Sequence, residues 1–244
     1  MSKPVYLSII IPAYNEAMNI ERTLDQMQRY LMAKPWDAEV IVVDDGSTDE
    51  TARLVEGRLK EDPRLKLLSD SKNRGKGFAV RKGMQQAQGE FRVFLDADGS
   101  TPVESIDRVL PLLCRGVDIV IGSRKRSDSK ILVRQPLVRR LGSAFFHHLA
   151  GFLAGGVRVS DYNCGFKAFR RNASEILFSK ARINDWAFDA ELLYLAKRHR
   201  LSLEEVSITW AHSATSKVRL WSTAFGCVAS LLQIRLMALR GEYD

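Results

Sequence analysis

Residues 91–99 read Phe91-Arg92-Val93-Phe94-Leu95-Asp96-Ala97-Asp98-Gly99, so two carboxylates follow directly on an apolar run. A buried strand does not tolerate two unpaired charges, and we therefore expect Asp96 and Asp98 at the end of a strand, facing a cleft. Residues i and i+2 of a strand point the same way, and hard cations such as Mg²⁺ or Mn²⁺ bind one or two carboxylates together with substrate phosphate. The pattern predicts a divalent-metal site. The structural alternative is an Asx turn, in which Asp98 accepts hydrogen bonds from local backbone only.

The apolar runs of the first half of the chain alternate with helical patterns. Strands are expected at residues 7–11, 40–43, 65–68, 91–95 and 117–121, and helices at about 20–31, 51–60, 78–87 and 104–113. Nearly continuous apolar strands fit a mostly parallel sheet with helices on both faces, which is a Rossmann-like α/β domain. Ligands of such sheets bind beyond the carboxyl ends of the strands. The chemistry is therefore expected in the segments that follow the strands.

Polar segments follow three of these strands, at residues 12–16, 44–49 and 96–98. Ser47 followed by Glu50 has the spacing of a capping box, which favours a structural role for Ser47 and Thr48 at the start of the next helix. Capping does not account for an acid at position 45, and we interpret Asp45 as an acceptor for a base edge or ribose of a nucleotide. Three polar clusters are thus expected on one rim of the sheet.

Two basic segments indicate anion binding. The loop Lys72-Asn73-Arg74-Gly75-Lys76-Gly77 precedes a helix and is a candidate anion cradle of backbone N–H groups, or equally a plain surface turn. It matches neither the P-loop nor the dinucleotide fingerprint. Further along, seven cations stand against Asp128, and they indicate a phosphate ligand or else a solvated basic loop: Arg124, Lys125, Arg126, Lys130, Arg134, Arg139 and Arg140. The helical pattern that follows is typical of an interfacial helix or a core helix: Phe145, Phe146, Leu149, Phe152 and Leu153.

The composition is that of a globular domain. The chain has 244 residues, of which 45% are hydrophobic and 27% charged. A net charge of +8 suits a nucleotide, a nucleic acid or an anionic membrane surface, but a nucleic-acid partner does not explain the ordered acids at three strand ends. Three widely spaced cysteines favour buried thiols in a reducing, cytosolic setting. We expect no signal peptide, because the first apolar run, residues 7–11, is shorter than a signal-peptide core and no cleavage site follows it. We expect no membrane span, because no uninterrupted apolar run reaches about 18 residues.

Taken together, the motifs resemble family 2 glycosyltransferases of the GT-A fold, and within that family the polyprenyl-phosphate (dolichyl-phosphate) sugar transferases. The matching segments are 12–16, 44–49, 73–77, 96–99, 122–124, 161–167, 184–192 and 216–217. The stretch Cys164-Gly165-Phe166-Lys167 and residues 186–191 are most similar to the dolichyl-phosphate β-glucosyltransferase branch. Each segment is weak alone, whereas their order and spacing along most of the chain are specific.

The resemblance implies a role for each candidate residue. The base, ribose and neighbouring donor contacts would fall to Pro12, Tyr14, Glu16, Asp45, Gly75 and Lys76, and the donor diphosphate to Lys217. The metal would be bound by Asp98, with Asp96 on the metal or sugar side. The acceptor phosphate would be bound by Arg124, together with Arg139 and Arg140. In mannosyltransferase relatives an arginine lies shortly before the pair that corresponds to Ser216-Lys217. The present sequence has no arginine there. His212 is a candidate substitute, or else an exposed loop residue.

The implied reaction is transfer of a hexose from a nucleotide-sugar to a polyprenyl phosphate, with inversion at the anomeric carbon. UDP-glucose with Mg²⁺ or Mn²⁺ is the expected donor, and GDP-mannose is the alternative. An anionic acceptor phosphate needs no strong base, so orientation would supply much of the rate. A hydroxyl acceptor would instead need Asp189 or Glu191 as base, and Asp189 stays among the catalytic candidates. A non-catalytic binding module is a further hypothesis.

The chain is divided into a glycosyltransferase domain at 1–215 and a C-terminal amphipathic helical segment at 216–244. An apolar helical face with nearby cations is predicted there: Trp221, Phe225, Val228, Leu232, Leu236 and Leu239 with Lys217, Arg219, Arg235 and Arg240. The face would meet anionic headgroups, or else cover the sheet or form a dimer contact. A lipid acceptor then implies peripheral docking on the cytoplasmic face of a membrane. The oligomeric state is not predicted.

Overall fold

The computed structural model describes residues 4–133, 151, 159–211 and 220–244. Its strands are β1 (Leu7–Ala13), β2 (Ala38–Asp44), β3 (Leu65–Ser69), β4 (Phe91–Leu95), β5 (Ile119–Ser123), β6 (Lys130–Val133), β7 (Phe166–Arg170), β8 (Leu203–Ser207) and β9 (Thr209–Ala211). Its helices are α1 (Ile20–Met32), α2 (Thr51–Arg58), α3 (Lys76–Gln86), the 3₁₀ turn η1 (Val103–Ser105), α4 (Ile106–Cys114), α6 (Arg171–Lys180), α7 (Phe188–Arg198) and α8 (Leu220–Leu239).

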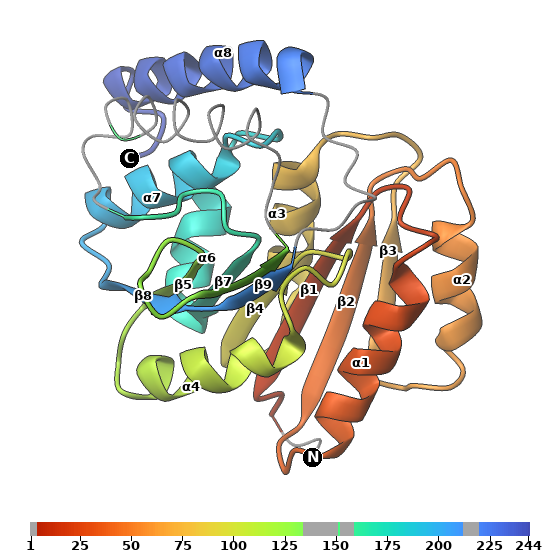
Figure 1. The fold of residues 1–244 in the computed structure, drawn as a ribbon. Coiled ribbons are helices and arrows are strands. Elements are labelled where there is room, and N and C mark those ends of the chain that lie inside the picture. The colour runs from red at the N-terminus through yellow and green to blue at the C-terminus, as the bar shows by residue number, and fades with distance from the viewer. Residues whose placement is uncertain (1–3, 134–150, 152–158, 212–219) are drawn as a thin grey trace.

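Within the described residues, seven strands form the central sheet in the order β3-β2-β1-β4-β7-β5-β8, and β6 pairs separately with β9. Strand β7 runs antiparallel to both of its neighbours, while the other pairs in the sheet are parallel (Figure 1). This confirms the predicted mostly parallel sheet. Because Leu7 lies opposite both Ala38 and Phe91, and Ala13 opposite Asp44, β1, β2 and β4 are aligned at their N-terminal ends, and β1 and β2 finish together.

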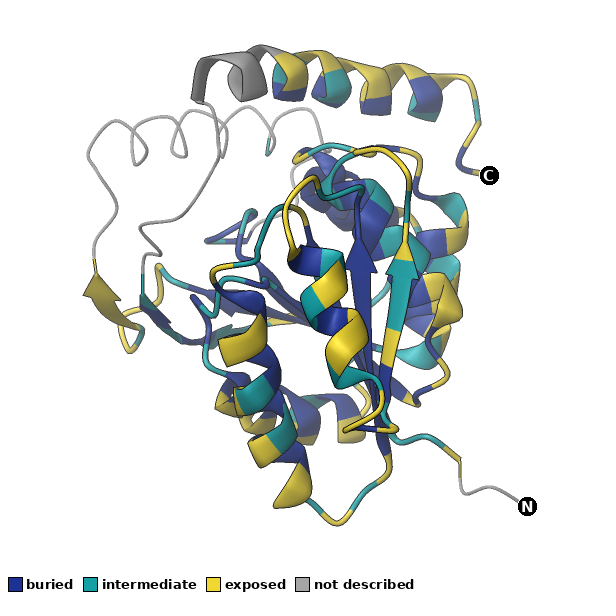
Figure 2. Cartoon of the chain, turned by 90° about the vertical axis from the view of Figure 1, so that its right-hand side faces the viewer, coloured by how far each residue is buried: buried dark blue, intermediate teal, exposed yellow. Residues whose placement is uncertain are grey.

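Helices cover both faces of this sheet, as the continuous apolar strands predict. Ile9 and Ile11 of β1 face the core beneath α1, α2 and α4, whereas Ile10 faces the core beneath α3, α6 and α7. All three side chains are fully buried, and burial stabilises the fold by roughly 1.5–3 kcal/mol per side chain. In Figure 2 the strands of the sheet are mostly dark blue, while the outward faces of the helices are yellow.

Two strands of the sheet, β7 and β8, are not among those predicted. The strand β7 lies between β4 and β5, with Phe94 opposite Lys167 and Ile121 opposite the same residue. A lysine inside the run Phe166-Lys167-Ala168-Phe169 interrupts the apolar pattern, and it is nevertheless buried. The antiparallel β7 therefore separates the parallel pairs on its two sides and brings residues 160–165 to the end of β4.

The predicted capping box at Ser47 and Glu50 is wrong. Helix α2 begins at Thr51, and no side chain caps it from the N-cap position. The Ser47 hydroxyl instead accepts a hydrogen bond from the Asn15 N–H (2.8 Å), and the Thr51 N–H donates to Asp49 (3.0 Å). Ser47 is engaged in joining two loops across the sheet edge, so it is not available to the helix terminus.

The C-terminal helix α8 has two apolar sides. Cys227, Leu231, Ile234 and Met237 are buried, and the last three belong to the core that also contains α7. The predicted apolar face lies partly in the open: Leu232, Leu236 and Leu239 are 50%, 52% and 72% exposed. None of the described helices has the length and apolar character needed to cross a bilayer. The division of the chain at residue 215 stays a prediction.

Candidate active site

The loops that follow β1 and β2 are joined by side-chain hydrogen bonds. The Asn15 carboxamide oxygen accepts from the N–H groups of Thr48 (2.7 Å) and Asp49 (3.2 Å). Asn15 has a φ of 54°, a left-handed conformation that asparagine adopts more readily than most residues. The Glu16 N–H donates to the Thr51 hydroxyl (2.8 Å). The two polar clusters predicted after these strands therefore form one continuous rim.

Asp45 holds the glycine-rich loop against this rim. Its buried carboxylate accepts hydrogen bonds from the Arg74 N–H (2.9 Å) and the Gly75 N–H (2.7 Å). Burial raises the pKa of Asp45 and outweighs these two hydrogen bonds, which lower it. Gly75 has a φ of 108°, and a Cβ there would lie 2.5 Å from the Asn184 carbonyl oxygen. The loop does cradle an anion, but that anion is the protein's own carboxylate; the predicted contact of Asp45 with a nucleotide stays a prediction.

Asp96 lies directly after β4, between Lys76 and Gly165. Its carboxylate accepts from the Lys76 ammonium at 2.5 Å, and its N–H donates to the Gly165 carbonyl (3.2 Å). A Cβ on Gly165 would lie 1.8 Å from Asp96 Oδ2, so only glycine leaves room for this carboxylate. Burial alone would lower the pKa of Lys76, but the charges of Asp96 and Asp189 outweigh it and raise the pKa.

Asp98 forms the Asx turn that was the structural alternative for this segment. Its carboxylate accepts from the Ser100 N–H (2.8 Å), and Gly99 takes the left-handed conformation with a φ of 68°. Burial, followed by the charge of Asp96, raises the pKa of Asp98. The turn and a metal site are compatible, because a carboxylate has two oxygens and about four lone-pair sites. Among the described residues, no group of three or more His, Cys, Asp and Glu side chains could hold a metal ion.

The other predicted donor contacts lie along the edge of the same rim. Tyr14 is 41% exposed, which leaves its ring accessible to a planar ligand. Pro12 is partly buried near the end of β1, opposite Val43. Glu16 is partly buried, and its carboxylate accepts from the Asn19 carboxamide (2.7 Å). Their assignment to a nucleotide stays a prediction.

Arg124 follows β5 and is held by a buried ion pair. Its Nε and Nη2 contact the two carboxylate oxygens of Asp161 at 2.7 and 2.8 Å, and its backbone N–H donates to the same carboxylate (3.0 Å). The guanidinium also lies 5.2 Å from the centre of the Trp210 ring. Burial would lower the pKa of Arg124, and Asp161 more than offsets it. A guanidinium has five N–H donors. The Asp161 carboxylate accepts from two of those of Arg124, which orients the side chain, and does not use the other three.

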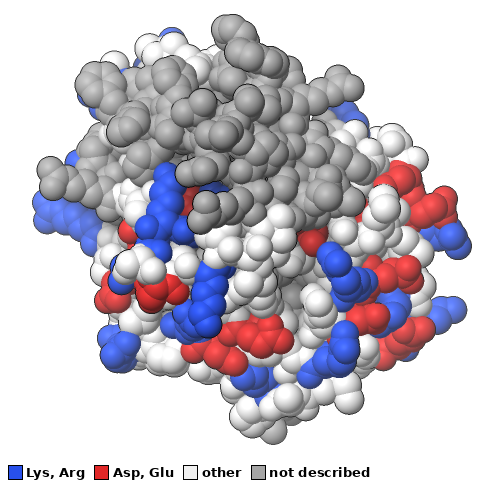
Figure 3. All heavy atoms as spheres, viewed as in Figure 1, with Lys and Arg blue, Asp and Glu red and all other residues white. Residues whose placement is uncertain are grey.

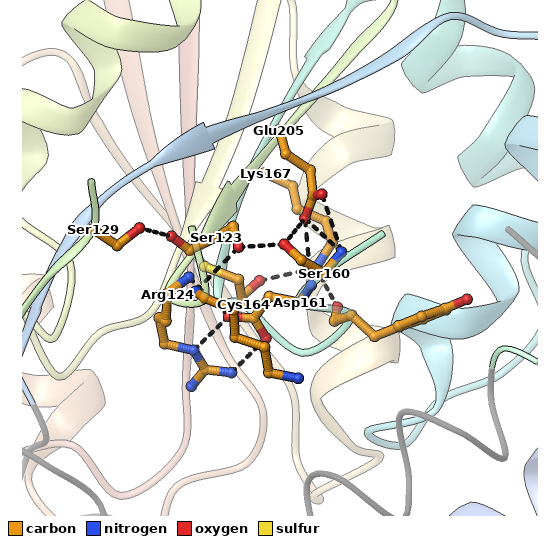
Figure 4. Close-up of polar contacts among 10 residues, drawn as sticks. Ser123, Arg124, Ser129, Ser160, Asp161, Cys164, Lys167 and Glu205 are labelled. Atoms are coloured by element: carbon orange, nitrogen blue, oxygen red, sulfur yellow. Dashed lines mark hydrogen bonds and ion pairs between the residues drawn. The ribbon is translucent and has the colours of Figure 1, made fainter. Parts of the chain in front are cut away.

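The turn that carries Asp161, the partner of Arg124, is itself held by a second carboxylate, that of Glu205. Glu205 on β8 accepts from the Ser160 N–H (2.9 Å) and hydroxyl (2.7 Å), and from the Asp161 N–H (3.3 Å). Figure 4 shows these groups together with Ser123, whose hydroxyl lies 2.7 Å from that of Ser160. Burial raises the pKa of Asp161, but Arg124 outweighs it and holds the pKa below its usual value.

The two acids considered as bases lie in the first turn of α7, and both are buried with partners. Asp189 contacts the Lys167 ammonium at 2.5 Å, and burial raises its pKa despite that lysine. Glu191 accepts from the N–H groups of Arg182 (2.8 Å) and Ile183 (2.9 Å) and from the Tyr243 hydroxyl (2.6 Å). Glu191 thus joins α7 to the loop before it and to the C-terminus, and the alternative role of Asp189 or Glu191 as a base stays a prediction.

Several site residues were missed, and several predicted ones lie outside the described residues. Asp161, Glu205 and Lys167 were not singled out as a charged set, although a lysine within an apolar run is a signal that a buried acid must exist elsewhere. The predicted residues and segments outside the described part are Arg134, Arg139, Arg140, His212, Lys217, Arg219 and the aromatic pattern at 145–153, Gly151 excepted, and the side chains of Trp221 and Phe225 are not described either.

The surface charge of the described residues does not form one basic patch on the face shown in Figure 3. Lys and Arg side chains there alternate with Asp and Glu. Ion pairs of this kind join Arg53 to Glu50 and Arg58 to Asp25. A nucleic-acid surface would present a continuous basic stripe. This face does not have one among its described residues.

Three comparisons place the chain among known proteins. The family profile "Glycosyl transferase family 2" matches residues 8–178. Dolichyl-phosphate beta-glucosyltransferase of Dictyostelium discoideum is 33% identical over 250 residues, covering 97% of this chain and 76% of that protein. The enzyme of the same name from Drosophila melanogaster is 36% identical, covering 91% and 72%, and that of Homo sapiens is 33% identical, covering 97% and 77%.

Solved structures agree with the fold. Glucosyl-3-phosphoglycerate synthase of Mycobacterium tuberculosis, crystallised with Mn²⁺, UDP-glucose and phosphoglyceric acid, superposes with a TM-score of 0.69 at 23% identity. The superposition covers 95% of this chain and 80% of that one. The family profile spans most of the sheet and its rim. The chain belongs to glycosyltransferase family 2.

Proposed function

We propose that this protein is an inverting, metal-dependent glucosyltransferase that moves glucose from UDP-glucose to a polyprenyl (dolichyl-type) phosphate. The names of its relatives give the donor sugar and the acceptor class, and a structural neighbour binds Mn²⁺ and UDP-glucose. Family 2 membership and the fold are consistent with this chemistry.

The observation that carries the proposal is the meeting of a donor side and an acceptor side at one turn. Residues 160–165 place Asp161 on Arg124 and the backbone of Gly165 against Asp96. Arg124 and Asp96 are close enough for the negative charge of Asp96 to contribute to the raised pKa of Arg124. A site for an anionic acceptor therefore lies beside the carboxylates that would meet the donor.

The acidic pair after β4 fits a hard divalent cation. Asp96 and Asp98 offer carboxylate oxygens, the ligands that Mg²⁺ and Mn²⁺ prefer, and such ions complete their shell with water and substrate phosphate. Asp96 is already paired with Lys76, so Asp98 is the carboxylate with the greater need of a cation. When bound there, the metal would supply neutralisation of the leaving diphosphate.

The residues themselves would bind and orient the two substrates. In the reaction an acceptor phosphate oxygen forms a bond to the anomeric carbon while the bond from that carbon to the donor diphosphate oxygen breaks on the opposite face. Arg124, fixed by Asp161 and Trp210, would hold the acceptor phosphate in line, and orientation of this kind supplies much of the rate. The acceptor is already anionic, so the buried Asp189 need not act as a base.

Docking of α8 on an anionic membrane belongs to the same proposal. Leu232, Leu236 and Leu239 form an exposed apolar edge, and the side chain of Arg240 is 71% exposed beside it. An apolar edge with basic neighbours suits the interface of a bilayer with anionic headgroups. The enzyme would then meet its lipid acceptor from the cytoplasmic face, as a peripheral protein.

A donor screen tests the reaction. UDP-glucose, GDP-mannose and UDP-galactose are each offered with a short polyprenyl phosphate and Mg²⁺ or Mn²⁺, and the glycolipid is measured by mass spectrometry. We expect a product with UDP-glucose, of inverted anomeric configuration. Turnover with GDP-mannose alone would overturn the choice of donor, and glucosylation of a hydroxyl acceptor but not of the lipid phosphate would overturn the choice of acceptor.

Vesicle co-sedimentation tests the docking. We expect binding to vesicles that contain anionic lipid, and weaker binding by the variant Leu232→Gln/Leu236→Gln, because both substitutions replace exposed apolar groups. Met32→Gln is the matched control, since it replaces an exposed apolar side chain of α1, outside the α8 edge. Equal sedimentation of all three proteins would contradict the role of this edge.

A further inference from the structure

Lys167 is a buried cation for which the proposed reaction has no direct use. Its side chain is 1% exposed, and burying an ammonium group costs several kcal/mol unless it is paired and hydrogen-bonded. All three of its N–H donors have acceptors: the carbonyl oxygens of Tyr162 (3.0 Å) and Cys164 (2.9 Å) and a carboxylate oxygen of Asp189 (2.5 Å). The ammonium group therefore ties the turn before β7 to the first turn of α7.

The first connection of Lys167 reaches the site through the turn. The carbonyls that it binds, those of Tyr162 and Cys164, directly precede Gly165 in the turn. The Gly165 carbonyl accepts the Asp96 N–H, and its missing Cβ makes room for the Asp96 carboxylate. The same turn begins with Asp161, which orients Arg124. Figure 4 shows Lys167, Cys164 and Asp161 in one group. A shift of this turn would move the donor side and the acceptor side together.

The second connection reaches Asp96 from its other side. Lys167 pairs with Asp189, the charge of Asp189 acts on Lys76, and Lys76 contacts the Asp96 carboxylate. The charges thus alternate from Lys167 through Asp189 and Lys76 to Asp96, and a further negative charge, that of Asp98, follows Asp96. With all groups ionised, two lysines face three carboxylates, and the excess negative charge lies at the Asp98 end, where a divalent cation would bind.

We propose that Lys167 is a positioning residue: it holds Asp96 from both sides and fixes the turn that orients Arg124. The inference rests on the proposed function for the identity of the substrates, but the geometry that it explains does not. It predicts that loss of the Lys167–Asp189 pair weakens metal binding and transfer even where the fold survives.

The test compares three variants with a matched control. Lys167→Met removes the ammonium group and leaves Asp189 unpaired, so it can unfold the protein. Lys167→Met/Asp189→Asn removes both charges. Asp189→Asn alone keeps the two carbonyl contacts of Lys167 but leaves its charge without a counter-ion. The control Lys66→Met also takes a lysine from a buried carboxylate, that of Glu39, but near the opposite ends of the strands. Thermal melts establish which variants are folded at the assay temperature.

Two readouts separate positioning from stability. The first is the Mn²⁺ dissociation constant in the presence of UDP, measured from the electron paramagnetic resonance signal of free Mn²⁺. The second is kcat and KM for glucose transfer. We expect the folded double variant and Asp189→Asn to bind Mn²⁺ about 10-fold more weakly and to lose about 10- to 100-fold in kcat/KM, with the control unchanged.

Folded variants with wild-type Mn²⁺ affinity and wild-type kcat/KM would overturn the inference, because Lys167 would then serve stability alone. If both Lys167 variants unfold, Asp189→Asn decides the matter by the same two readouts. Failure of the wild-type protein to transfer glucose would instead refute the proposed function, and the Mn²⁺ comparison would remain valid.

Discussion

Gly165→Ala is the substitution that tests the placement of Asp96 most directly. A Cβ at this position would lie 1.8 Å from Asp96 Oδ2, 2.4 Å from its Cγ and 2.8 Å from its Oδ1. The carboxylate must retreat by about 1.6 Å to reach an ordinary van der Waals contact of 3.4 Å. Gly165 is not among the glycines with positive φ, so alanine meets no backbone strain there and the effect is that of the displaced carboxylate.

The displacement also breaks the contact between Asp96 and Lys76, which is 2.5 Å long. A misplacement of about 1 Å near a reacting centre can cost about 100-fold in rate. We therefore expect kcat/KM for glucose transfer to fall at least about 100-fold, equivalent to about 2.7 kcal/mol of transition-state stabilisation. The loss should appear in kcat as well as in KM for the donor, because in the proposed function Asp96 would face the donor and the reacting carbon.

The assay follows transfer of labelled glucose to a short polyprenyl phosphate, beside a thermal melt of each protein. Gly57→Ala is the control, because a Cβ on this helical glycine meets no atom within 4 Å. It should leave transfer unchanged and stabilise the fold by up to about 1 kcal/mol. A folded Gly165→Ala protein with kcat/KM within threefold of wild type would refute the reasoning, since transfer would then not depend on the position of the Asp96 carboxylate.

Three further predictions concern single side chains. Asp98→Ala should abolish activation by Mn²⁺ in the transfer assay, and near-normal transfer at saturating Mn²⁺ would show that the metal assignment is wrong. Tyr14→Ala should raise KM for the donor about 10-fold with little change in kcat, because stacking contributes about 1–3 kcal/mol per base; an unchanged KM would remove Tyr14 from the base site. Asp161→Asn should cost about 3–5 kcal/mol of unfolding free energy at pH 7, as expected for a broken buried pair. Burial raises and Arg124 more strongly lowers the pKa of Asp161, so the difference between wild type and variant in denaturant melts should be constant above about pH 4 and shrink as the pH falls further. A difference that grows on acidification would contradict this.

The apolar pattern predicted β1, β2, β4 and β5 because each of these strands is buried on both faces. The parallel strand β8 is only partly buried and was not predicted. Ile9, Ile10 and Ile11 are all fully buried, although alternate side chains face different helical layers. The carboxyl-end rule then predicted the rim, since it needs only strand direction and order along the chain. Asp96 and Asp98 could be placed in this way before any partner was known.

Strand β7 and the charged partners of the site could not be predicted in the same way. Nothing local in Phe166-Lys167-Ala168-Phe169 specifies an antiparallel strand inserted between two parallel ones, because direction is set by the pairing of distant strands. Likewise Arg124 is 37 residues from Asp161 in sequence, and Lys167 is 22 residues from Asp189. A sequence reveals that a buried charge needs a partner, but only the fold selects which one.

Six carboxylates of the candidate active site differ in what neutralises their charge, and this difference favours one of them as the metal ligand. Asp161 and Asp189 are paired with buried cations, and Asp96 is paired with Lys76. Asp45 and Glu191 each accept two or more N–H or O–H donors of the protein. Asp98 accepts from the Ser100 N–H and lies next to another acid, and its pKa is raised by burial and by Asp96. Removing a carboxylate from water without a cation is costly. Of these six carboxylates Asp98 has the least compensation, which supports the proposed cation at Asp98 on electrostatic grounds that do not depend on any relative.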